Sequence, residues 1–462
     1  MRKQQPWFST ICLLMLAAAM FLSGCTAADN KEIPVTLTFW HVYGDQTNSP
    51  LNDMVEEFNK TIGAQRGIKV QVTFVSDTNS IHEAVLRSAR KEPGAGDLPD
   101  MFISYPKTVL AMPDADILID FHDYFSEDEL SDFIPSFLKE GMIDDRLVVF
   151  PIAKSTEIMY INQTLFERFA RDTGASVEEL ETWDGLFSLA KKYYQWTDDQ
   201  TPDQPGDGKP FFANDFHFNY FQIGVESLGE SFFSGDQIQY GKAFMRVWDP
   251  YADAAIRGSL WLQNGYSTEP FRTGDVIVST ASSASVLYFE DVVTYADNRT
   301  EPITIIAKPM PSFSDGKKMV IQRGAGLCAV QSTPQKEEAI AVFLKWLTEP
   351  ETNARFATSL GYMPVTKSAF SILPDYLENL QDDKYRSLYD AYLKTRESYT
   401  FYTPPQLSNY LELEQSFEKN VRSKLRTAAG ALENDGADIE TLKQQALENL
   451  QTSLPHSEGW PS

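Results

Sequence analysis

Residues 35–103 alternate between strand and helix patterns, and this alternation limits the possible folds more than any other feature of the chain. Val35, Leu37 and Phe39 repeat with the period of two that is typical of a strand, whereas the apolar residues after Pro50 repeat at helical spacing. The predicted elements, in order, are a strand at 35–41, a helix that begins at Ser49-Pro50, a strand at 70–74, a helix at 80–91 and a strand at 98–103. This order favours a parallel sheet with helices on its faces, so we expect an α/β fold.

The ends of these strands are the first candidates for a binding site, because ligands of such sheets bind beyond the carboxyl ends of the strands. The predicted strands end at Trp40-His41-Val42-Tyr43, Ser76-Asp77-Thr78 and Ser104-Tyr105-Pro106. Aromatic rings and hydroxyl groups would therefore meet at one edge of the sheet. The alternative is that His41 and Tyr105 are ordinary loop residues, and their spacing alone does not decide between the two.

The rest of the chain contains more α/β sequence. Residues 147–161 predict two strands separated by a kink at Pro151, and residues 276–280 and 303–307 predict short strands. A helix is predicted over 335–357, where Ser332-Thr333-Pro334 forms the cap. From about residue 367 the sequence is largely helical and acidic.

The first 25 residues have the features of an export signal. Arg2 and Lys3 form a positive head, and the apolar run at 11–22 is too short for a comfortable membrane span. Leu22-Ser23-Gly24-Cys25 resembles a bacterial lipobox. We therefore expect a signal peptide at 1–24, a lipid on Cys25 and a polar tether at 25–32, which anchor the protein to a membrane surface. The alternative is a plain signal peptide with an incidental cysteine.

Charge and cysteine content narrow the function further. The chain has 40 Lys and Arg against 65 Asp and Glu, a net charge of −25. Such a balance argues against nucleic acid and against a polybasic contact with anionic lipid. Cys12 lies in the signal and Cys25 takes the lipid, so Cys328 stands alone and no internal disulfide is expected. Cys328 lies in an apolar run and is predicted to be buried.

Motifs for catalysis, cofactors and metals were sought and not found. The histidines, at 41, 82, 122, 217 and 456, include no pair at ligand spacing, so no metal site is expected. A Gly-rich phosphate loop and a G-x-S-x-G element are absent, and we expect no cofactor and no enzymatic activity. Residues 198–209 partly resemble a calcium-binding loop, but Pro205 occupies a donor position and no terminal Glu follows. An acidic surface loop is the favoured interpretation.

Several segments resemble, in the family's order, the extracellular solute-binding proteins that include maltose-binding and glycerol-3-phosphate-binding proteins. These segments cover nearly the whole chain after the signal. They are Leu37-Thr38-Phe39-Trp40-His41, Leu98-Pro99-Asp100-Met101, Val149-Phe150-Pro151, Met159-Tyr160-Ile161-Asn162-Gln163-Thr164-Leu165-Phe166, Thr182-Trp183-Asp184-Gly185-Leu186-Phe187, Phe271-Arg272-Thr273-Gly274-Asp275-Val276, Phe343-Leu344-Lys345-Trp346-Leu347 and Gly361-Tyr362-Met363-Pro364-Val365.

The resemblance implies a two-lobed periplasmic-binding-protein-like fold of type II, whose chain crosses between the lobes three times. Carried onto this sequence, the crossings are expected near 150–154, 303–309 and 356–362. Lobe one would comprise 33–150 and 309–357, and lobe two 151–303 and 360–462. Closure of the lobes around the ligand would be a hinge motion.

The resemblance, together with the strand ends, also implies a set of cleft residues. Aromatic rings suit a sugar because its C–H face stacks on them, while hydroxyls need paired donors and acceptors. The candidates are Trp40, His41, Tyr43, Ser104, Tyr105, Ser155, Thr156, Phe218, Tyr220, Ser282, Ser283, Arg323, Gly324, Gly326 and Tyr362. For the aromatic run at 216–220, core packing is the competing interpretation. Gly324 and Gly326 would bring backbone amides close to the ligand.

This sequence departs from the maltose binders at two places. Small residues stand where they use a tryptophan after the Gly-led strand, and the first crossing has no obvious glutamate, which puts maltodextrin in doubt. The expected function is the substrate-binding lipoprotein of an ABC importer for a mono- or oligosaccharide, a monomer that hands its ligand to permease subunits outside the bacterial cell membrane. The alternatives are a surface lipoprotein enzyme acting on polysaccharide and a binding protein for a non-sugar ligand such as a phosphorylated polyol.

Overall fold

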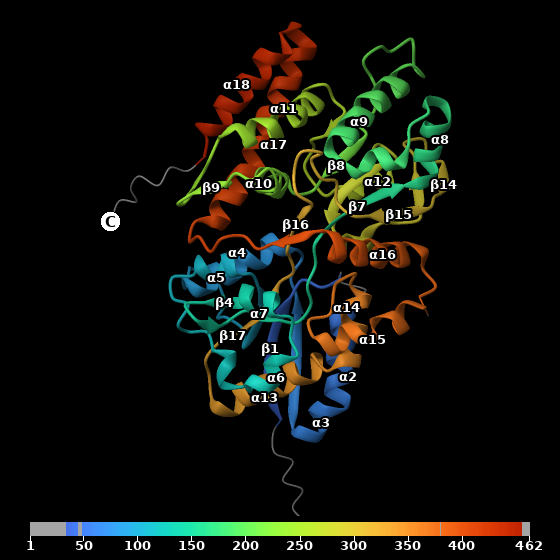
Figure 1. Cartoon of the computed structure of the whole chain (residues 1–462). Coiled ribbons are helices and arrows are strands. Elements are labelled where there is room, and N and C mark those ends of the chain that lie inside the picture. The colour runs from blue at the N-terminus through green and yellow to red at the C-terminus, as the bar shows by residue number, and fades with distance from the viewer. Residues whose placement is uncertain (1–33, 45–48, 379, 455–462) are drawn as a thin grey trace, which may run out of the picture.

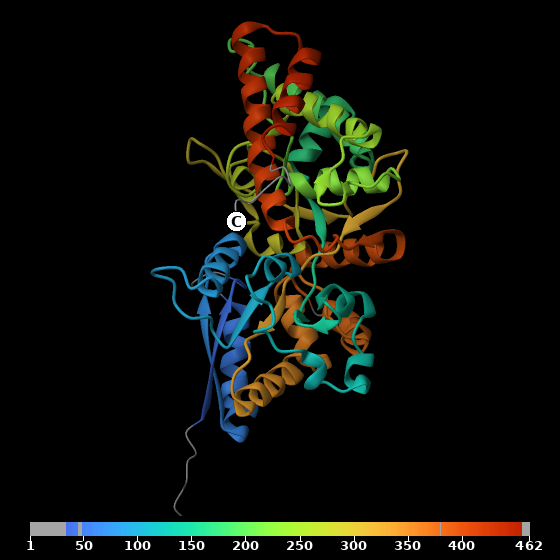
Figure 2. The same ribbon diagram turned by 90° about the vertical axis from the view of Figure 1, so that its left-hand side faces the viewer.

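The computed structural model describes residues 34–44, 49–378 and 380–454 and consists of two lobes joined by a narrower waist (Figures 1 and 2). The predicted signal peptide and the whole tether, with Cys25, lie outside the described residues. Each lobe contains a five-stranded mixed sheet with helices packed on it, which confirms the predicted two-lobed α/β fold. In the described part of the chain no helix combines the length and apolar character that a membrane span requires.

The sheet of lobe one contains the β-α-β-α-β unit predicted from the sequence. Its strand order is β2-β1-β3-β17-β6. The strands are β1 (Val35–His41), β2 (Ile68–Phe74), β3 (Met101–Ser104), β6 (Phe150–Pro151) and β17 (Gly326–Ala329). β1 runs parallel to both β2 and β3, as expected, whereas β17 is antiparallel to β3 and β6. Cys328 is fully buried in β17, as predicted.

The helices of lobe one begin where the sequence supplies caps. Ser49 accepts a hydrogen bond from the backbone of Asn52, and Pro50 occupies the first turn. The ring of Phe58 packs 5.0 Å from that of Phe343 on a neighbouring helix. The helices are α2 (Pro50–Lys60), α3 (Ile62–Arg66), α4 (Thr78–Ala89), α5 (Pro106–Leu110), α6 (Glu127–Ser131), α7 (Pro135–Gly141), α13 (Pro334–Leu347), α14 (Pro350–Ser359) and α15 (Lys367–Glu378).

The prediction of one continuous helix over 335–357 is wrong, because the structure contains two helices there, α13 and α14. α13 ends at Leu347, and Pro350 opens the next helix. Proline has no backbone N–H and clashes with the preceding turn of a continuous helix, so it stands in the first turn of a new one.

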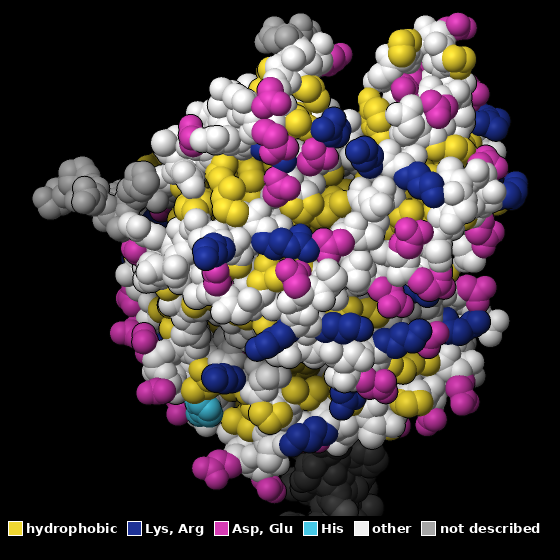
Figure 3. Space-filling view, turned by 45° about the horizontal axis from the view of Figure 1, so that its top comes forward, with side chains coloured by type: hydrophobic (Ala, Val, Ile, Leu, Met, Phe, Trp, Pro, Cys, Tyr) yellow, Lys and Arg dark blue, Asp and Glu magenta, His cyan; other side chains and the backbone are white. Residues whose placement is uncertain are grey.

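Lobe two has the strand order β11-β8-β12-β7-β15, in which β7 is antiparallel to both of its neighbours. The strands are β7 (Glu157–Asn162), β8 (Phe212–Asn214), β11 (Leu260–Trp261), β12 (Val278–Ser282) and β15 (Ile305–Lys308). The helices are α8 (Gln163–Thr173), α9 (Trp183–Asp198), α10 (His217–Ser227), α11 (Lys242–Ile256), α12 (Thr268–Arg272), α16 (Asp383–Ser398), α17 (Tyr410–Asp435) and α18 (Ile439–Gln451). On the face shown in Figure 3, Lys and Arg are interspersed with Asp and Glu.

Two of the three crossings lie later in the chain than expected. The first, between β6 and β7, agrees with the expectation. For the second, Met310 and Phe313 still belong to the core of lobe two, so the chain reaches lobe one only after Gln322. The third follows α15, which packs on α14 of lobe one, and precedes α16, which packs on β15 of lobe two. The sequence signals at Pro309 and Gly361 mark bends rather than the crossings themselves.

The first crossing is hydrogen-bonded to two other segments. Lys154 exchanges backbone hydrogen bonds of 3.0 and 2.6 Å with Met363, which lies between α14 and α15, and Ser155 exchanges two of 2.9 Å with Arg323 at the second crossing. Beside them, β16 (Met319–Ile321) pairs with β18 (Thr400–Tyr402). The waist is therefore held by backbone hydrogen bonds between segments that are distant in the sequence.

Candidate ligand-binding site

A cavity of about 920 Å³ lies between the lobes. Lobe one contributes Thr78 of α4, Tyr105, α5 and the segment from α7 to residue 145, and lobe two contributes Asn219 of α10 and the start of α17. Residues 321–323 and 403–406, next to the waist, complete the lining. The size lies in the upper part of the range of about 300–1,000 Å³ that is typical of small-molecule sites.

Arg323 is the buried cation of this cavity and it is already paired. Its guanidinium donates to Oε1 of Glu157 at 3.1 Å and lies 3.5 Å from the centre of the Phe216 ring. Nδ2 of Asn219 donates to the same Glu157 oxygen at 2.5 Å. Burial alone would lower the pKa of Arg323, but the Glu157 carboxylate outweighs it and raises that pKa, so the guanidinium stays charged.

Three of the six other charged side chains of the lining, Lys107, Glu140 and Glu414, also form ion pairs. Lys107 of α5 forms an ion pair with Glu414 of α17, which joins the two lobes across the cavity. Glu140 of α7 accepts from Lys154 at 3.0 Å and from the side-chain amide of Gln322. Both partners of Glu140 come from crossing segments, so this carboxylate ties the waist to lobe one.

Tyr105 lines the cavity from lobe one, at the carboxyl end of β3 where the sequence predicted a ligand contact. The ring lies 5.4 Å from that of His82, and the ammonium group of Lys107 lies 5.5 Å from its centre. Burial raises the pKa of Tyr105 above its usual value, so the phenol is neutral. Of the predicted contacts, Tyr105 and Arg323 are the two found in the lining.

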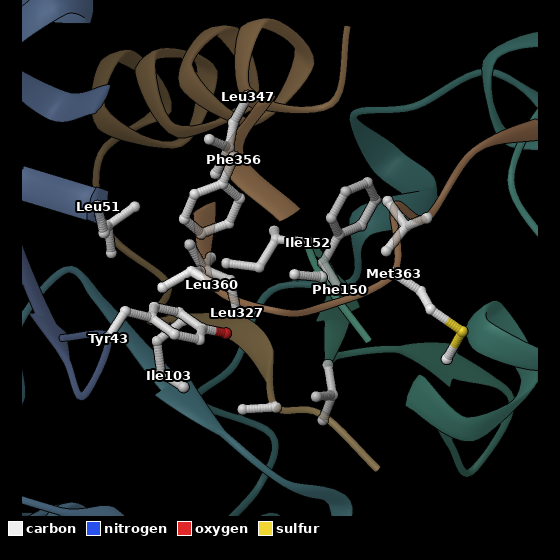
Figure 4. Packing of buried hydrophobic residues seen from close by; sticks show 14 of the residues in the cluster. Tyr43, Leu51, Ile103, Phe150, Ile152, Leu327, Leu347, Phe356, Leu360 and Met363 are labelled. Atoms are coloured by element: carbon white, nitrogen blue, oxygen red, sulfur yellow. The ribbon is translucent and has the colours of Figure 1, made fainter. Parts of the chain in front are cut away.

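Tyr43 and Tyr362 lie together behind Tyr105. Their rings meet edge to face at 5.7 Å, and Tyr362 interacts electrostatically with Tyr105. Figure 4 shows Tyr43 packed among Leu360 and Ile103. The hydroxyl of Tyr43 is buried and has no hydrogen-bond partner, whereas Ser104 interacts with the thiol of Cys328. These predicted residues are near the cavity but outside its lining.

Trp40 and His41 lie outside the lining of the cavity, and His41 is held within the fold. Trp40 is half-buried in β1, on the side of the sheet opposite to Phe39 and His41. His41 is fully buried, with Nε2 donating to Oδ1 of Asn52 at 2.9 Å and Nδ1 accepting from the backbone of Tyr43 at 3.2 Å. Burial lowers its pKa to about 4, so the ring is neutral and fixes the loop after β1.

The predicted contacts at the waist also hold the fold rather than line the cavity. Ser155 pairs through its backbone, and the hydroxyl of Thr156 donates to the carbonyl of Ile321 at 2.7 Å. Gly324 has a φ of +101°, and a Cβ there would stand 2.7 Å from Cα of Lys154. A Cβ on Gly326 would stand 2.7 Å from the carbonyl of Phe150. Both glycines therefore allow crossing strands, not a ligand, to approach.

The lobe-two predictions fell on the core. Phe218 and Tyr220 are 0% and 3% exposed on α10, so core packing is the correct interpretation of this aromatic run. Tyr220 packs 4.5 Å from the ring of Tyr251. Ser283 is fully buried and its hydroxyl accepts from Tyr392, while Ser282 caps the short helix that follows β12. Because α10 is buried on nearly all sides, aromatic residues at consecutive positions along it are all buried.

Sequence reasoning missed several residues of the site. Glu157, which begins β7 just after the first crossing, holds both Arg323 and Asn219 and was not among the predicted residues. Glu157 stands two residues after the predicted contact Ser155, and this closeness in sequence could have pointed to it. No sequence feature could have pointed to Glu414, because 307 positions separate it from its partner Lys107 and only the fold joins them.

The described residues contain no group of three or more His, Cys, Asp or Glu suited to a metal ion. In the loop at 198–209, Oδ1 of Asp198 accepts from the backbone of Gly206 at 2.6 Å, and Thr201 donates to Asp207. These oxygens are thus used within the loop itself.

Comparison with known proteins agrees with this architecture. The chain is 22% identical to the sn-glycerol-3-phosphate-binding periplasmic protein UgpB of Escherichia coli (strain K12), over 78% of this chain and 81% of UgpB. A structure of Mycobacterium tuberculosis UgpB with glycerophosphocholine matches with a TM-score of 0.67 and 18% identity, over 90% of this chain and 98% of that one. Maltose-bound MalE3 of T. maritima matches with 0.63 and 17%, over 91% and 100%.

The family comparison covers most of the protein. Residues 53–384 match the family described as bacterial extracellular solute-binding protein. This range includes both sheets except β1, all three crossings and most of the cavity lining. Members of this family bind solutes rather than transform them. The chain therefore belongs to the bacterial extracellular solute-binding protein family.

Proposed function

We propose that this protein is the substrate-binding lipoprotein of an ABC importer and that it captures a carbohydrate between its lobes by hinge closure. The observation that carries the proposal is a cavity of oligosaccharide size whose buried cation is already paired and whose rim offers aromatic rings and hydrogen-bonding groups. A neutral polyol suits such a site because its hydroxyls bind paired polar groups and its C–H faces bind rings.

Unsatisfied polar groups at this cleft support the proposal. Buried polar atoms normally have a hydrogen-bond partner. The hydroxyl of Tyr43 and the carbonyl oxygen of Gln322 have none. Gln322 lines the cavity, and Tyr43 lies behind Tyr105, which also lines it.

The charge of the lining favours a neutral ligand over a phosphate. The cationic side chains are Lys107, Lys139 and Arg323, and the anionic ones are Glu140, Asp144, Asp145 and Glu414. A phosphate would have to compete with Glu157 for Arg323 and with Glu414 for Lys107. The alternative is a glycerophosphodiester or glycerol phosphate ligand, which the names of the UgpB relatives favour.

Closure by a hinge is supported by contacts that join the lobes away from the waist. The hydroxyl of Tyr288 in lobe two donates to the carbonyl of Gly44 in lobe one at 3.0 Å, and Lys107 pairs with Glu414. A ligand that touches both lobes would shift the balance towards the closed form.

The test is calorimetry on residues 26–462, which lack the lipid-bearing cysteine. The probes are maltose, maltotriose, mannotriose, sn-glycerol-3-phosphate and glycerophosphocholine. We expect saturable binding of a saccharide, a smaller radius of gyration by X-ray scattering when it is bound, and no product. If only the phosphorylated probes bind, the carbohydrate proposal is wrong and a glycerol phosphate or glycerophosphodiester is the ligand class. Cleavage of a saccharide would overturn the binding function.

The lipid anchor needs its own test, because Cys25 lies outside the described residues. We expect mass spectrometry of the protein from a bacterial membrane to find a diacylglyceryl group on Cys25. Cys25→Ala should release the protein into the soluble fraction. Membrane retention of this variant would contradict the anchor and leave the binding function untouched.

A further inference from the structure

The first and second crossings are joined at the waist by backbone and side-chain contacts. Ser155 and Arg323 exchange two backbone hydrogen bonds of 2.9 Å. On the lobe-one side of this backbone pair, Nζ of Lys154 donates to the carbonyl of Gly324 at 2.9 Å. A side chain on Gly324 would collide with the backbone of Lys154, so the two crossings are in direct contact there. The two crossings can therefore bend only together.

On the lobe-two side of the same backbone pair, the crossings are fixed to lobe two. The hydroxyl of Thr156 donates to the carbonyl of Ile321 at 2.7 Å, which joins the crossings to each other. The carbonyl of Thr156 accepts from the backbone of Ser283, after β12, at 2.9 Å. The guanidinium of Arg323 is held by Glu157 at the start of β7. A movement of lobe two therefore carries this side of the crossings with it.

On the lobe-one side, the crossings are fixed to α7 by one carboxylate. Glu140 accepts from Nζ of Lys154 at 3.0 Å and from the side-chain amide of Gln322. The same amide donates to the carbonyl of Ser136, also on α7, at 3.3 Å. Lys154 is 2% exposed and Glu140 is 8% exposed. Lys154 of the first crossing and Gln322 of the second thus meet on a single buried group of lobe one.

Stability alone does not account for a buried ion pair at this place. Apolar residues of similar volume would avoid the cost of removing two charges from water, and such replacements are often neutral or stabilising. The ammonium group of Lys154, however, binds Glu140 and the carbonyl of Gly324 at once, because it has three donors. An apolar side chain has no directed contacts of this kind, so the ion pair fixes the position of the crossings more sharply than packing would.

We propose that the pair of Lys154 and Glu140 positions the hinge. It holds the lobe-one side of the first and second crossings on α7, so that bending is confined to Ser155 and Arg323 and the lobes move along one path. This inference rests on the hinge closure of the proposed function. Without the pair, the crossings would bend at more points, and the lobes would sample a wider range of separations even with no ligand present.

The test measures the separation of the lobes by pulsed electron paramagnetic resonance on residues 26–462, with spin labels on Glu83→Cys in α4 and Met245→Cys in α11. Both positions are exposed and outside the cavity lining, and Cys328 is buried. The test variant is Lys154→Met with Glu140→Gln, which leaves no buried ion without its partner. We expect its ligand-free distance distribution to be roughly twofold broader or more than that of the wild type, with a similar Tm.

The matched control is Lys443→Met with Asp249→Asn, which removes the pair of another buried lysine inside lobe two. Its distance distribution should match that of the wild type. If the distribution of Lys154→Met with Glu140→Gln is as narrow as that of the wild type, the positioning role is overturned, whatever the Tm.

This measurement needs no ligand, so its result does not depend on whether a carbohydrate is the ligand. Maltotriose and mannotriose are then added to the labelled wild type. If a saccharide binds and shortens the distances, hinge closure stands even where the positioning role has failed. If a saccharide binds and leaves the distances unchanged, hinge closure itself fails and the positioning role fails with it.

Discussion

The two lobes present different kinds of wall to the cavity. Lobe one builds its wall from neighbouring segments, α5 and the residues from α7 to 145, and contributes the Tyr105 ring and a rim of surface charges. Lobe two uses residues nearly 200 positions apart, Asn219 on α10 and Glu414 on α17, and places buried ions behind them. Lobe one therefore supplies most of the charged groups of the lining, whereas the short wall of lobe two rests on buried ionic groups.

The buried ions of lobe two form a connected network. Glu418 accepts from the backbone of Phe218 at 2.8 Å and pairs with Arg422 at 3.3 Å. Arg422 in turn donates to Nε2 of His217 at 2.7 Å. Burial, together with the neighbouring Arg422, holds the pKa of His217 well below its usual value, so the ring is a neutral acceptor. Lobe one has no network of this extent among its described cavity residues, so stability and binding should respond differently to changes in the two walls.

The largest effect is expected for Glu157→Ala. The substitution leaves the Arg323 guanidinium buried without its carboxylate, which should lower the free energy of unfolding by about 3–5 kcal/mol. Urea denaturation measures this. The control is Glu83→Ala, which breaks an exposed pair with Arg87 and should change stability by less than about 0.5 kcal/mol. Equal losses of unfolding free energy for Glu157→Ala and Glu83→Ala would show that the buried ion pair does not stabilise lobe two.

The second effect concerns pH and Glu418. Burial raises the pKa of this carboxyl to about 8, with Glu414 and Glu157 adding to the rise. The folded state then holds a proton that the unfolded state has lost, so stability should fall as pH rises from about 4.5 to 8, by on the order of a few kcal/mol. Thermal denaturation across this range measures the fall. Glu418→Gln should flatten the dependence; an unchanged slope would assign the titration to another group.

The third effect tests the wall of lobe one. Tyr105→Ala removes a ring from the lining and should weaken saccharide binding roughly 10-fold or more with little change in stability. Tyr362→Ala should act in the same direction and less strongly, because Tyr362 lies behind the lining. Tyr376→Ala, on α15 and outside the cavity, is the control for calorimetry. Unchanged affinity in both cleft variants would remove these rings from the site.

The smallest effect joins the two walls. A double-mutant cycle with Lys107→Met and Glu414→Gln should give a coupling of about 0.5–1 kcal/mol in the binding free energy, because the pair is only partly buried. The same cycle on Lys345 and Glu129, a surface pair within lobe one, should give no coupling to binding. A coupling near zero at Lys107 and Glu414 would mean that the pair does not favour the closed form.

Local patterns were sufficient for much of the fold. The strands at 35–41 and 98–103, the cap at Ser49 and the parallel pairing of β1 with β2 were predicted because alternation and capping depend on neighbouring residues. The site was predicted less well. Tyr105 and Arg323 were found in the lining, whereas Phe218 and Tyr220 were not, because an aromatic residue looks the same in sequence whether it faces a ligand or a core.

The sequence by itself determined the α/β class, the membership of a solute-binding family and the position of Tyr105 at a strand end. Only the tertiary structure decided that Glu157 neutralises Arg323, that Lys107 meets Glu414 and that the later crossings follow Gln322 and α15. The physical reason is range: periodicity and capping act over a few residues, whereas an ion pair or a lobe boundary depends on segments brought together from distant parts of the chain.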